Sequence, residues 1–381
     1  MTEAQALLDR SFVPIVDEVA RLRPGGAHII DVHTHLGLDE DGMTLDPAGL
    51  IEMLDQVDAQ QAVVFPLHDP ERSPAYRLPN DRVLDWAAGS DGRLIPFCRL
   101  DPAEQPVAEA ERCLGLGARG IKLHPRAQAF GLAGQVEPIF ALAEEARVPI
   151  LIHAGRGLPD TFAAELVEVA NKHPGAGLIM AHVGVADQAV MGDGLRDHPR
   201  AVFDSSWLST IDMLSLFTRV PAERIAFGSD PPYGRTLTGL FLLLRTAACL
   251  GISPEVQRHM LGGAAQRLIA DEELLPASAP PAPQRLLVDA RLIRLHTGLM
   301  LVFGSVVGGT PALEMLELAR RICLDPDPGP AGAAFERILP LLYTAKQILI
   351  LEPEFPRRAL LPIVVAMAIA ATEVPQQPAL P

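Results

Sequence analysis

Cysteines and long apolar runs are scarce in this sequence of 381 residues, and both shortages restrict where the protein works. The longest apolar stretch, residues 359–371, is too short to cross a bilayer and contains Pro362, so we expect a buried helix there. The first residues lack a basic segment followed by an apolar run, so no signal peptide is expected. No two cysteines have CxxC spacing, which indicates buried free thiols in a reducing compartment. We therefore expect a cytoplasmic protein without a membrane partner.

Positive charge is also in short supply, with 32 Lys and Arg residues against 47 Asp and Glu residues and a net charge of −15. A strongly acidic surface repels nucleic acid and anionic membranes, so neither is expected as a partner. Such a surface does not exclude an anionic small molecule, because a local basic pocket can override the overall field. A small-molecule substrate is therefore the expected partner.

A glycine-rich phosphate turn is missing after the first apolar run, where residues 33–37 read HTHLG. An open doubly wound sheet, the alternative fold, would carry such a turn there. Eight short apolar runs alternate with helix-like segments, and their continuous apolar character is typical of parallel strands covered on both faces. This rhythm predicts an α/β fold, a (β/α)8 TIM barrel. The eight runs are residues 28–32, 62–66, 94–100, 119–123, 149–152, 177–181, 201–204 and 224–228.

The pattern outside the predicted barrel is helical. Residues 1–26 contain an amphipathic helix that we expect to be bent or broken near Pro14. The barrel is predicted for residues 27–271, followed by a Pro/Ala-rich linker over 272–285. Residues 286–381 have helical periodicity and end in a tail that is expected to be mobile. The apolar face of this helical region must be buried on the barrel or across a two-fold interface, so a homodimer is one expectation.

Polar residues follow several of the predicted strands at the point where each strand ends. The carboxyl ends of barrel strands meet at one face, where functional side chains gather. His33 and His35 share one face of the first strand, because side chains alternate along a strand. Histidine and aspartate are the usual nitrogen and oxygen ligands of a catalytic zinc-like ion, so a metal site is predicted. The polar residues at strand ends are His33, His35, His153, His182 and Asp230.

The motifs around these residues resemble the amidohydrolase superfamily. They are DVHTH, GIKLHP, ILIHAG, IMAHVG and FGSDPPYG. The closer resemblance is to the amidohydrolase-2 family, which includes aminocarboxymuconate-semialdehyde decarboxylase and aromatic acid decarboxylases. It covers about residues 27–270 and says little about the substrate. The sequence departs from the family in the late segment 260–269, where Ala264 or Ala265 stands in place of a common asparagine.

The resemblance implies a ligand set and two catalytic roles. His33, His35, His153 and Asp230 would hold one divalent ion, with zinc the expected metal. Such an ion lowers the pKa of bound water to about 7, and Asp230 would accept the proton of that water. His182 would orient the reacting groups, donate a proton or stabilise developing charge, unless it is only structural.

Lys122 and His124, in the GIKLHP motif, are expected to face the mouth of the barrel as substrate-binding residues. Lys122 has three interpretations. A carboxylated lysine would bridge two ions, with His153 and His182 serving the second. An ammonium group would bind a substrate carboxylate, and a structural lysine would pair with Asp31, which is also expected to face inward. We favour the ammonium group, because the other motifs resemble mononuclear members.

Arg126, Arg156 and Arg235 follow the fourth, fifth and eighth strands and are candidates for a bidentate clamp on a substrate carboxylate. Three classes of function follow. The first is a metal-dependent hydrolase acting on an amide, lactone or ester of a small carboxylate-bearing substrate. The second is a non-oxidative decarboxylase of an aromatic or unsaturated acid at the same metal site. The third, a non-catalytic binding protein, is disfavoured because no expected ligand is missing.

Overall fold

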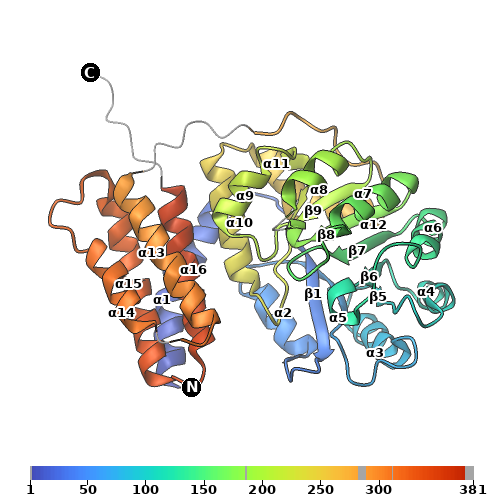
Figure 1. Cartoon of the computed structure of the whole chain (residues 1–381), viewed down its shortest axis with the longest axis horizontal. Coiled ribbons are helices and arrows are strands. Elements are labelled where there is room, and N and C mark those ends of the chain that lie inside the picture. Colours follow the sequence, from blue (N-terminus) through green and yellow to red (C-terminus); the bar gives the residue numbers. More distant parts are fainter. Residues whose placement is uncertain (1, 185–186, 282–288, 311, 374–381) are drawn as a thin grey trace.

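The structure is a computed structural model that describes residues 2–184, 187–281, 289–310 and 312–373. Its larger part is a barrel of parallel strands wrapped by helices (Figure 1). Each of the eight predicted runs contains a strand, with Phe97 interrupting the third. The barrel strands are β1 (Ile30–Leu38), β3 (Gln61–Pro66), β4 (Leu94–Pro96) with β5 (Cys98–Arg99), β6 (Ile121–Leu123), β7 (Pro149–His153), β8 (Gly177–Ala181), β9 (Ala201–Asp204) and β10 (Ile225–Ala226).

Backbone hydrogen bonds close the barrel at its two seams. At one seam, the Phe97 amide donates to the Val64 carbonyl over 2.8 Å, which joins the split third strand to β3. At the other, the Val32 amide donates to the Phe227 carbonyl over 2.9 Å, and the Asp230 amide donates to the His33 carbonyl over 2.8 Å. The expected TIM barrel is thus confirmed. The second seam also brings the segment after β10 directly against the histidines of β1.

Helices cover the outside of the barrel and alternate with its strands, as the sequence rhythm predicts. Asp46 caps α2 and accepts from the Gly49 amide over 2.8 Å, as expected for an aspartate before Pro47. The covering helices are α2 (Pro47–Asp55), α3 (Arg77–Ala88), α4 (Pro106–Gly115), α6 (Glu137–Ala146), α7 (Phe162–Lys172), α8 (Gln188–Leu195), α9 (Thr210–Leu216), α10 (Thr236–Cys249), α11 (Pro254–Arg258) and α12 (Ala264–Ile269). A short helix, α5 (Pro125–Gln128), follows β6, and β2 (Thr44–Leu45) pairs with the end of β1.

The helix near the amino terminus, α1 (Glu3–Leu22), is continuous through Pro14, so the expected break there is wrong. Proline removes one amide donor from the helix, and the buried side chains on either side of it keep α1 packed. Phe12, Ile15 and Val19 are all part of the main hydrophobic core. Packing of this apolar face compensates for the missing hydrogen bond.

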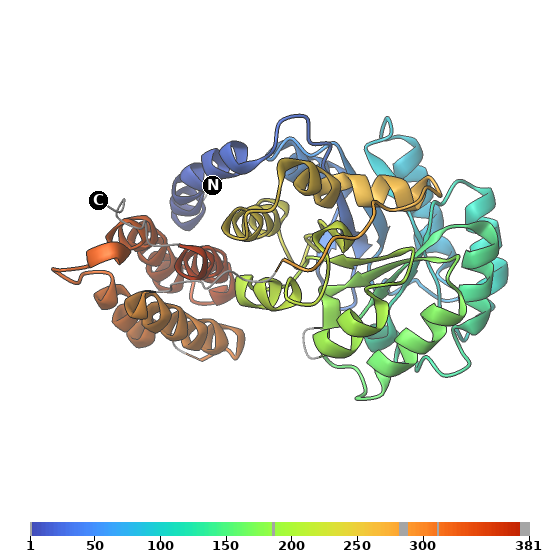
Figure 2. The same ribbon diagram turned by 90° about the horizontal axis from the view of Figure 1, so that it is seen from above.

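Within the described residues after the barrel, four α-helices are present: α13 (Ala290–Val307), α14 (Leu313–Ile322), α15 (Gly332–Leu351) and α16 (Leu360–Thr372). They form a bundle beside the barrel, and α1 lies with them (Figures 1 and 2). We call these five helices the helical unit. The apolar run 359–371 forms the buried helix α16, as expected. Among the described helices, only α13 has the length and apolar composition of a membrane span, which alone is weak support for one.

Ion pairs fasten the helical unit to the barrel. Glu18 on α1 accepts hydrogen bonds from Arg245 on α10 and from Arg337 on α15. Arg245 also donates to Glu373 over 3.2 Å. Glu18 and Arg245 are both buried, yet each has an opposite charge in contact. The seam between the two parts is therefore a closed network of paired charges.

Candidate metal centre

The two histidines of β1 reach the interior through an irregularity in the strand. The pairing of β1 with β3 shifts between Asp31 and Thr34, so the simple alternation of side chains is interrupted there. Val32 belongs to the inner core of the barrel, yet the adjacent His33 also points inward. Asp31 instead accepts from the amides of His33 and Ser229, at 3.2 and 3.0 Å. These contacts disfavour the alternative in which Lys122 is a structural partner of Asp31.

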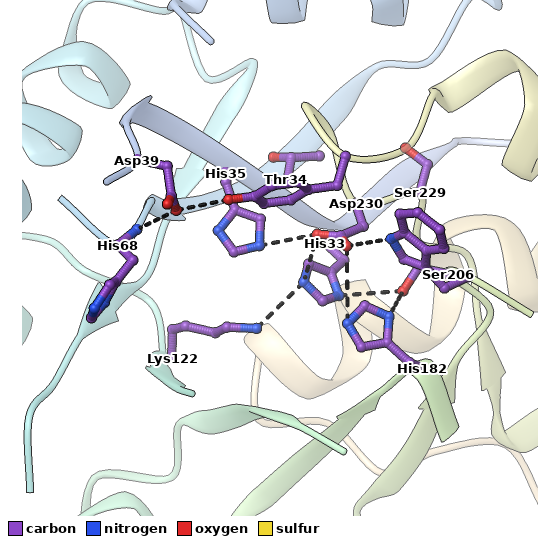
Figure 3. Close-up of polar contacts among 12 residues, drawn as sticks. His33, Thr34, His35, Asp39, His68, Lys122, His182, Ser206, Ser229 and Asp230 are labelled. Carbon is purple, nitrogen blue, oxygen red and sulfur yellow. Dashed lines mark hydrogen bonds and ion pairs between the residues drawn. The ribbon is translucent and has the colours of Figure 1, made fainter. Parts of the chain in front are cut away.

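His33, His35 and Asp230 converge on one point (Figure 3). The Asp230 Oδ1 atom lies 3.2 Å from His33 Nε2 and 3.0 Å from His35 Nε2. This oxygen is buried and has no hydrogen bond among the described residues. A buried carboxylate oxygen without a donor is costly unless a cation is present. The three ligand atoms therefore fit a divalent metal ion.

A second group joins His33 to His182 through Asp204, at the end of β9. The Asp204 Oδ2 atom accepts from His33 Nδ1 over 2.7 Å and from Ser206 Oγ over 2.6 Å. Ser206 has one hydroxyl proton, so its oxygen then accepts from His182 Nδ1 at 2.9 Å. With Asp204 ionised, both imidazoles carry their proton on Nδ1 and keep the Nε2 lone pair toward Asp230. Asp204 thus orients both histidines, a common arrangement beside a metal.

Sequence reasoning missed Asp204 and Ser206, although the signal for Asp204 was present. Asp204 ends the apolar run 201–204, in the same way that the chosen histidines end theirs. A glycine makes room for its contact with His33: a Cβ atom on Gly228 would lie 2.1 Å from Asp204 Oδ1. His182 and Asp230 both have φ of 61°, a left-handed conformation that non-glycine residues adopt rarely and often at functional sites.

His153, the fourth expected ligand, ends β7 inside the same mouth but stands apart from both clusters. Its ring stacks on His124 at a centroid distance of 4.1 Å and meets His182 at 5.0 Å. Neither of its ring nitrogens has a hydrogen bond among the described residues, and its side chain is buried. These free nitrogens are compatible with a ligand role, although His153 is not gathered with the other three ligand atoms.

Burial dominates the electrostatics of the centre. It lowers the pKa of His33, His35 and His182 well below the ordinary histidine value, so the rings are neutral. Burial also lowers the pKa of His153 to about 3. It raises the pKa of Asp230 well above the usual carboxyl value, against the attraction of Lys122. Neutral imidazoles around a desolvated carboxyl group are the donor set that a divalent cation stabilises.

The expected substrate-binding residues divide into buried and exposed groups. Lys122 is fully buried, and its Nζ atom lies 3.3 Å from His33 Nε2. Burial lowers its pKa to about 7. His124 stacks on His153, and its Nδ1 atom accepts from the Ala127 amide over 3.1 Å at the start of α5. The three expected clamp residues, Arg126, Arg156 and Arg235, are exposed.

Two aromatic residues complete the surroundings of Asp230. Trp207 Nε1 donates to Asp230 Oδ2 over 2.6 Å, so the second carboxylate oxygen has a donor while Oδ1 has none. The Tyr233 hydroxyl donates to Asp39 over 2.7 Å on the neighbouring loop. The two oxygens of Asp230 are thus chemically distinct.

Comparisons with known proteins place the barrel in a family. The amidohydrolase family model matches residues 30–270. Similar solved structures are an uncharacterized TIM-barrel protein from Bordetella bronchiseptica (17% identity, TM-score 0.52, covering 64% of this chain and 98% of that chain) and a putative amidohydrolase from Staphylococcus aureus (16%, 0.50, 64% and 99%). A third is an amidohydrolase from Burkholderia multivorans (16%, 0.52, 64% and 99%). These likenesses support the fold alone.

The matching structures are covered almost completely by about two thirds of this chain, so the remaining third lies outside the match. A comparison with curated proteins finds no match. The family match spans the strands that carry His33, His35, His153, His182 and Asp230. Because the family model matches more than half of this chain, the chain belongs to the amidohydrolase family.

Proposed function

We propose that this protein is a metal-dependent hydrolase that acts on an amide, lactone or ester of a small carboxylate-bearing substrate. Family membership implies an enzyme, and one observation carries the reaction type. Asp230 Oδ1, without a hydrogen bond, faces the Nε2 atoms of His33 and His35 at 3.2 and 3.0 Å. His33, His35 and Asp230 would hold the ion, with His153 as the fourth ligand. A divalent ion there, zinc by our expectation, supplies a water whose pKa is near neutrality.

The protein's own residues would move the proton. Asp230 accepts it from the attacking water, while Trp207 holds the second carboxylate oxygen and keeps the group oriented. His182 Nε2 lies 4.0 Å from Asp230 Oδ2 and carries a lone pair, because the ring proton is on Nδ1, which donates to Ser206 Oγ. His182 is therefore first an acceptor of the proton and then its donor to the leaving group. The surrounding burial excludes bulk water from this transfer.

The second candidate is a non-oxidative decarboxylase at the same centre, and Lys122 is the observation that favours it. The Lys122 ammonium is fully buried beside His33 and has no carboxylate within 4.0 Å among the described residues. A substrate carboxylate bound there would lie next to the metal ligands. The two reactions differ in whether that carboxylate remains in the product.

One experiment separates the two candidates. The purified, zinc-loaded protein is assayed against a panel of lactones and 4-nitrophenyl esters, and in parallel against aromatic and unsaturated acids for release of carbon dioxide. We expect metal-dependent hydrolysis without carbon dioxide. Carbon dioxide release without hydrolysis would move the assignment to the decarboxylase. Elemental analysis should find one divalent ion per chain, whereas two would favour a carboxylated Lys122 bridging a pair.

A further inference from the structure

Arg99 is a buried cation in the mouth of the barrel that neither the expected clamp nor the proposed mechanism uses. It ends β5 and is paired in register with Lys122 of β6. Phe97, two residues earlier, belongs to the inner core, so the Arg99 side chain also points inward. The side chain is 1% exposed, which is as buried as the metal-site residues themselves.

The donors of Arg99 are only partly used. Its Nε, Nη1 and Nη2 atoms donate to Gln128 Oε1, the Pro66 carbonyl and His68 Nδ1 over 3.3, 3.1 and 3.3 Å. A guanidinium has five N–H groups, so two remain without an acceptor in the part of the chain that the structure describes. The three acceptors in use are all neutral. The guanidinium also lies 4.9 Å from the centre of the Tyr76 ring, which supports its plane.

Arg99 has no carboxylate within 4.0 Å among the described residues, and the same holds for Lys122. Burial lowers the pKa of Arg99, and the one carboxylate that opposes this shift is Asp39, whose Oδ2 atom already accepts from the Tyr233 hydroxyl and the His68 amide. A buried guanidinium without a carboxylate in contact is costly, because a desolvated charge needs an opposite charge or several hydrogen bonds. A bound anion would supply both.

The backbone of Arg99 is fixed in advance. Asn80 on α3 accepts from the Arg99 amide over 2.9 Å and donates to the Arg99 carbonyl over 3.1 Å. This pair of hydrogen bonds holds the strand end that α3 covers. A guanidinium on a fixed backbone loses little conformational entropy when it binds a planar anion.

We propose that Arg99 binds the carboxylate of the substrate, with Lys122 beside it, so that the enzyme prefers esters, lactones or amides of dicarboxylic acids. This inference rests on the proposed hydrolase function and names its substrate class. The two free N–H groups of Arg99 bind the carboxylate that is not attacked. The ester or amide carbonyl then lies toward His33 and Asp230, because Lys122 separates Arg99 from them. Arg99 therefore replaces the exposed Arg126, Arg156 and Arg235 as the residue that we expect to determine specificity.

A matched pair of probes tests this site in the zinc-loaded protein. 4-Nitrophenyl hydrogen glutarate carries the distal carboxylate, and 4-nitrophenyl butyrate has a similar acyl chain without that charge. Arg99→Gln should lower kcat/KM for the glutarate ester by about 10- to 100-fold, the range for a lost charged hydrogen bond. Hydrolysis of the butyrate ester should change by less than about threefold. Arg119→Gln, an exposed arginine before β6, is the control and should change neither.

A purely structural Arg99 would make a different prediction. If Arg99→Gln lowers kcat/KM equally for the two esters, Arg99 only stabilises the loops after β3 and β6, and the inference is wrong. Arg99→Lys keeps the positive charge but not the paired N–H donors of the guanidinium. It should recover part of the preference for the glutarate ester over the butyrate ester. Melting temperature and zinc content of each variant show whether the fold and the metal site are intact.

Binding of glutarate itself separates this inference from the proposed reaction. Calorimetric titration of glutarate into the zinc-loaded protein should give binding that Arg99→Gln weakens about 10-fold or more. If neither ester is hydrolysed but this weakening is seen, the hydrolase proposal fails and the carboxylate site stands. If glutarate does not bind, or binds equally to both proteins, the site is refuted. Stronger binding of inorganic phosphate than of glutarate would refute the assignment to a carboxylate.

Discussion

The barrel mouth and the seam of the helical unit both contain buried charged side chains, but these charges are paired at the seam and, within the described residues, left without partners in the mouth. At the seam, Glu18 accepts hydrogen bonds from two arginines, and Arg245 has two carboxylate partners. In the mouth, Asp230 Oδ1 has no hydrogen bond, and Arg99 has no carboxylate in contact within the described residues. Paired buried charges hold two parts of a protein together. Buried charges left unpaired are places where a metal ion or a ligand completes the structure.

The largest effect is expected from Asp230→Asn. The substitution keeps the shape and an oxygen atom but removes the base and the negative charge. The turnover number should fall at least about 10²-fold, the usual scale for a positioned acid or base. The free energy of unfolding of the metal-free protein should not fall, because an unpaired buried charge is removed. Steady-state kinetics and urea unfolding measure the two quantities, and Asp193→Asn on the exposed face of α8 is the control.

The opposite pattern is expected from Glu18→Gln at the seam. This change leaves Arg245 buried and weakens two contacts at once, so the free energy of unfolding should fall by about 3 kcal/mol. The specific activity of the folded fraction should stay the same, since the seam is not part of the metal centre. Urea unfolding with a parallel activity assay measures both, and Asp17→Asn, on the exposed side of α1, is the matched control. A large loss of activity at unchanged stability would contradict the distinction between the two regions.

A smaller effect is expected from Ser206→Ala, which removes the link between Asp204 and His182. His182 could then carry its proton on either nitrogen, so activity should fall about 10-fold, as for other residues that orient metal-site histidines. Zinc content should be unchanged, and Ser206→Thr, which restores the hydroxyl, should recover activity. A loss of zinc in Ser206→Ala would show that His182 is itself a ligand.

The smallest effect concerns exposed charge in the helical unit. Hydrogen bonds from Arg320 and Lys346 lower the pKa of Glu317 to about 2. A carboxylate with a depressed pKa contributes stability that is present above its unfolded pKa and lost as the pH falls toward 2. The unfolding free energies of wild type and Glu317→Gln should therefore differ slightly at pH 7 and converge as the pH falls to about 2. A difference that grows on acidification would contradict this sign.

Much of the fold could be predicted because a two-sided parallel strand has a direct signature in the sequence. The eight apolar runs locate the strands, and the polar residues after several of them locate the mouth. The sequence does not predict which side chains of β1 point into the barrel, because the register shift between Asp31 and Thr34 depends on pairing with β3. Simple alternation placed Asp31 beside Lys122, whereas its carboxylate binds the segment after β10.

The hydrogen-bonding partners of the site were also beyond the sequence. Ser206 connects Asp204 to His182 across strands, and no spacing rule relates these residues before the barrel closes. Arg99 was overlooked for a related reason. Exposed loop arginines are the obvious candidates for a carboxylate clamp. Only the folded structure shows that Arg99 is buried and has N–H donors left over.

The position of α1 has a consequence for how the protein folds. Thr2 at the start of this helix donates to Glu352 over 2.8 Å, a contact between residues 350 positions apart. On the ribosome, the last barrel strand emerges long before α13 to α16 are synthesised. The apolar face of α1, with Phe12, Ile15 and Val19, therefore has no bundle to cover it for much of synthesis. Contacts of such long range form slowly, so the docking of α1 is expected to be the late step, and a chaperone would act at that stage.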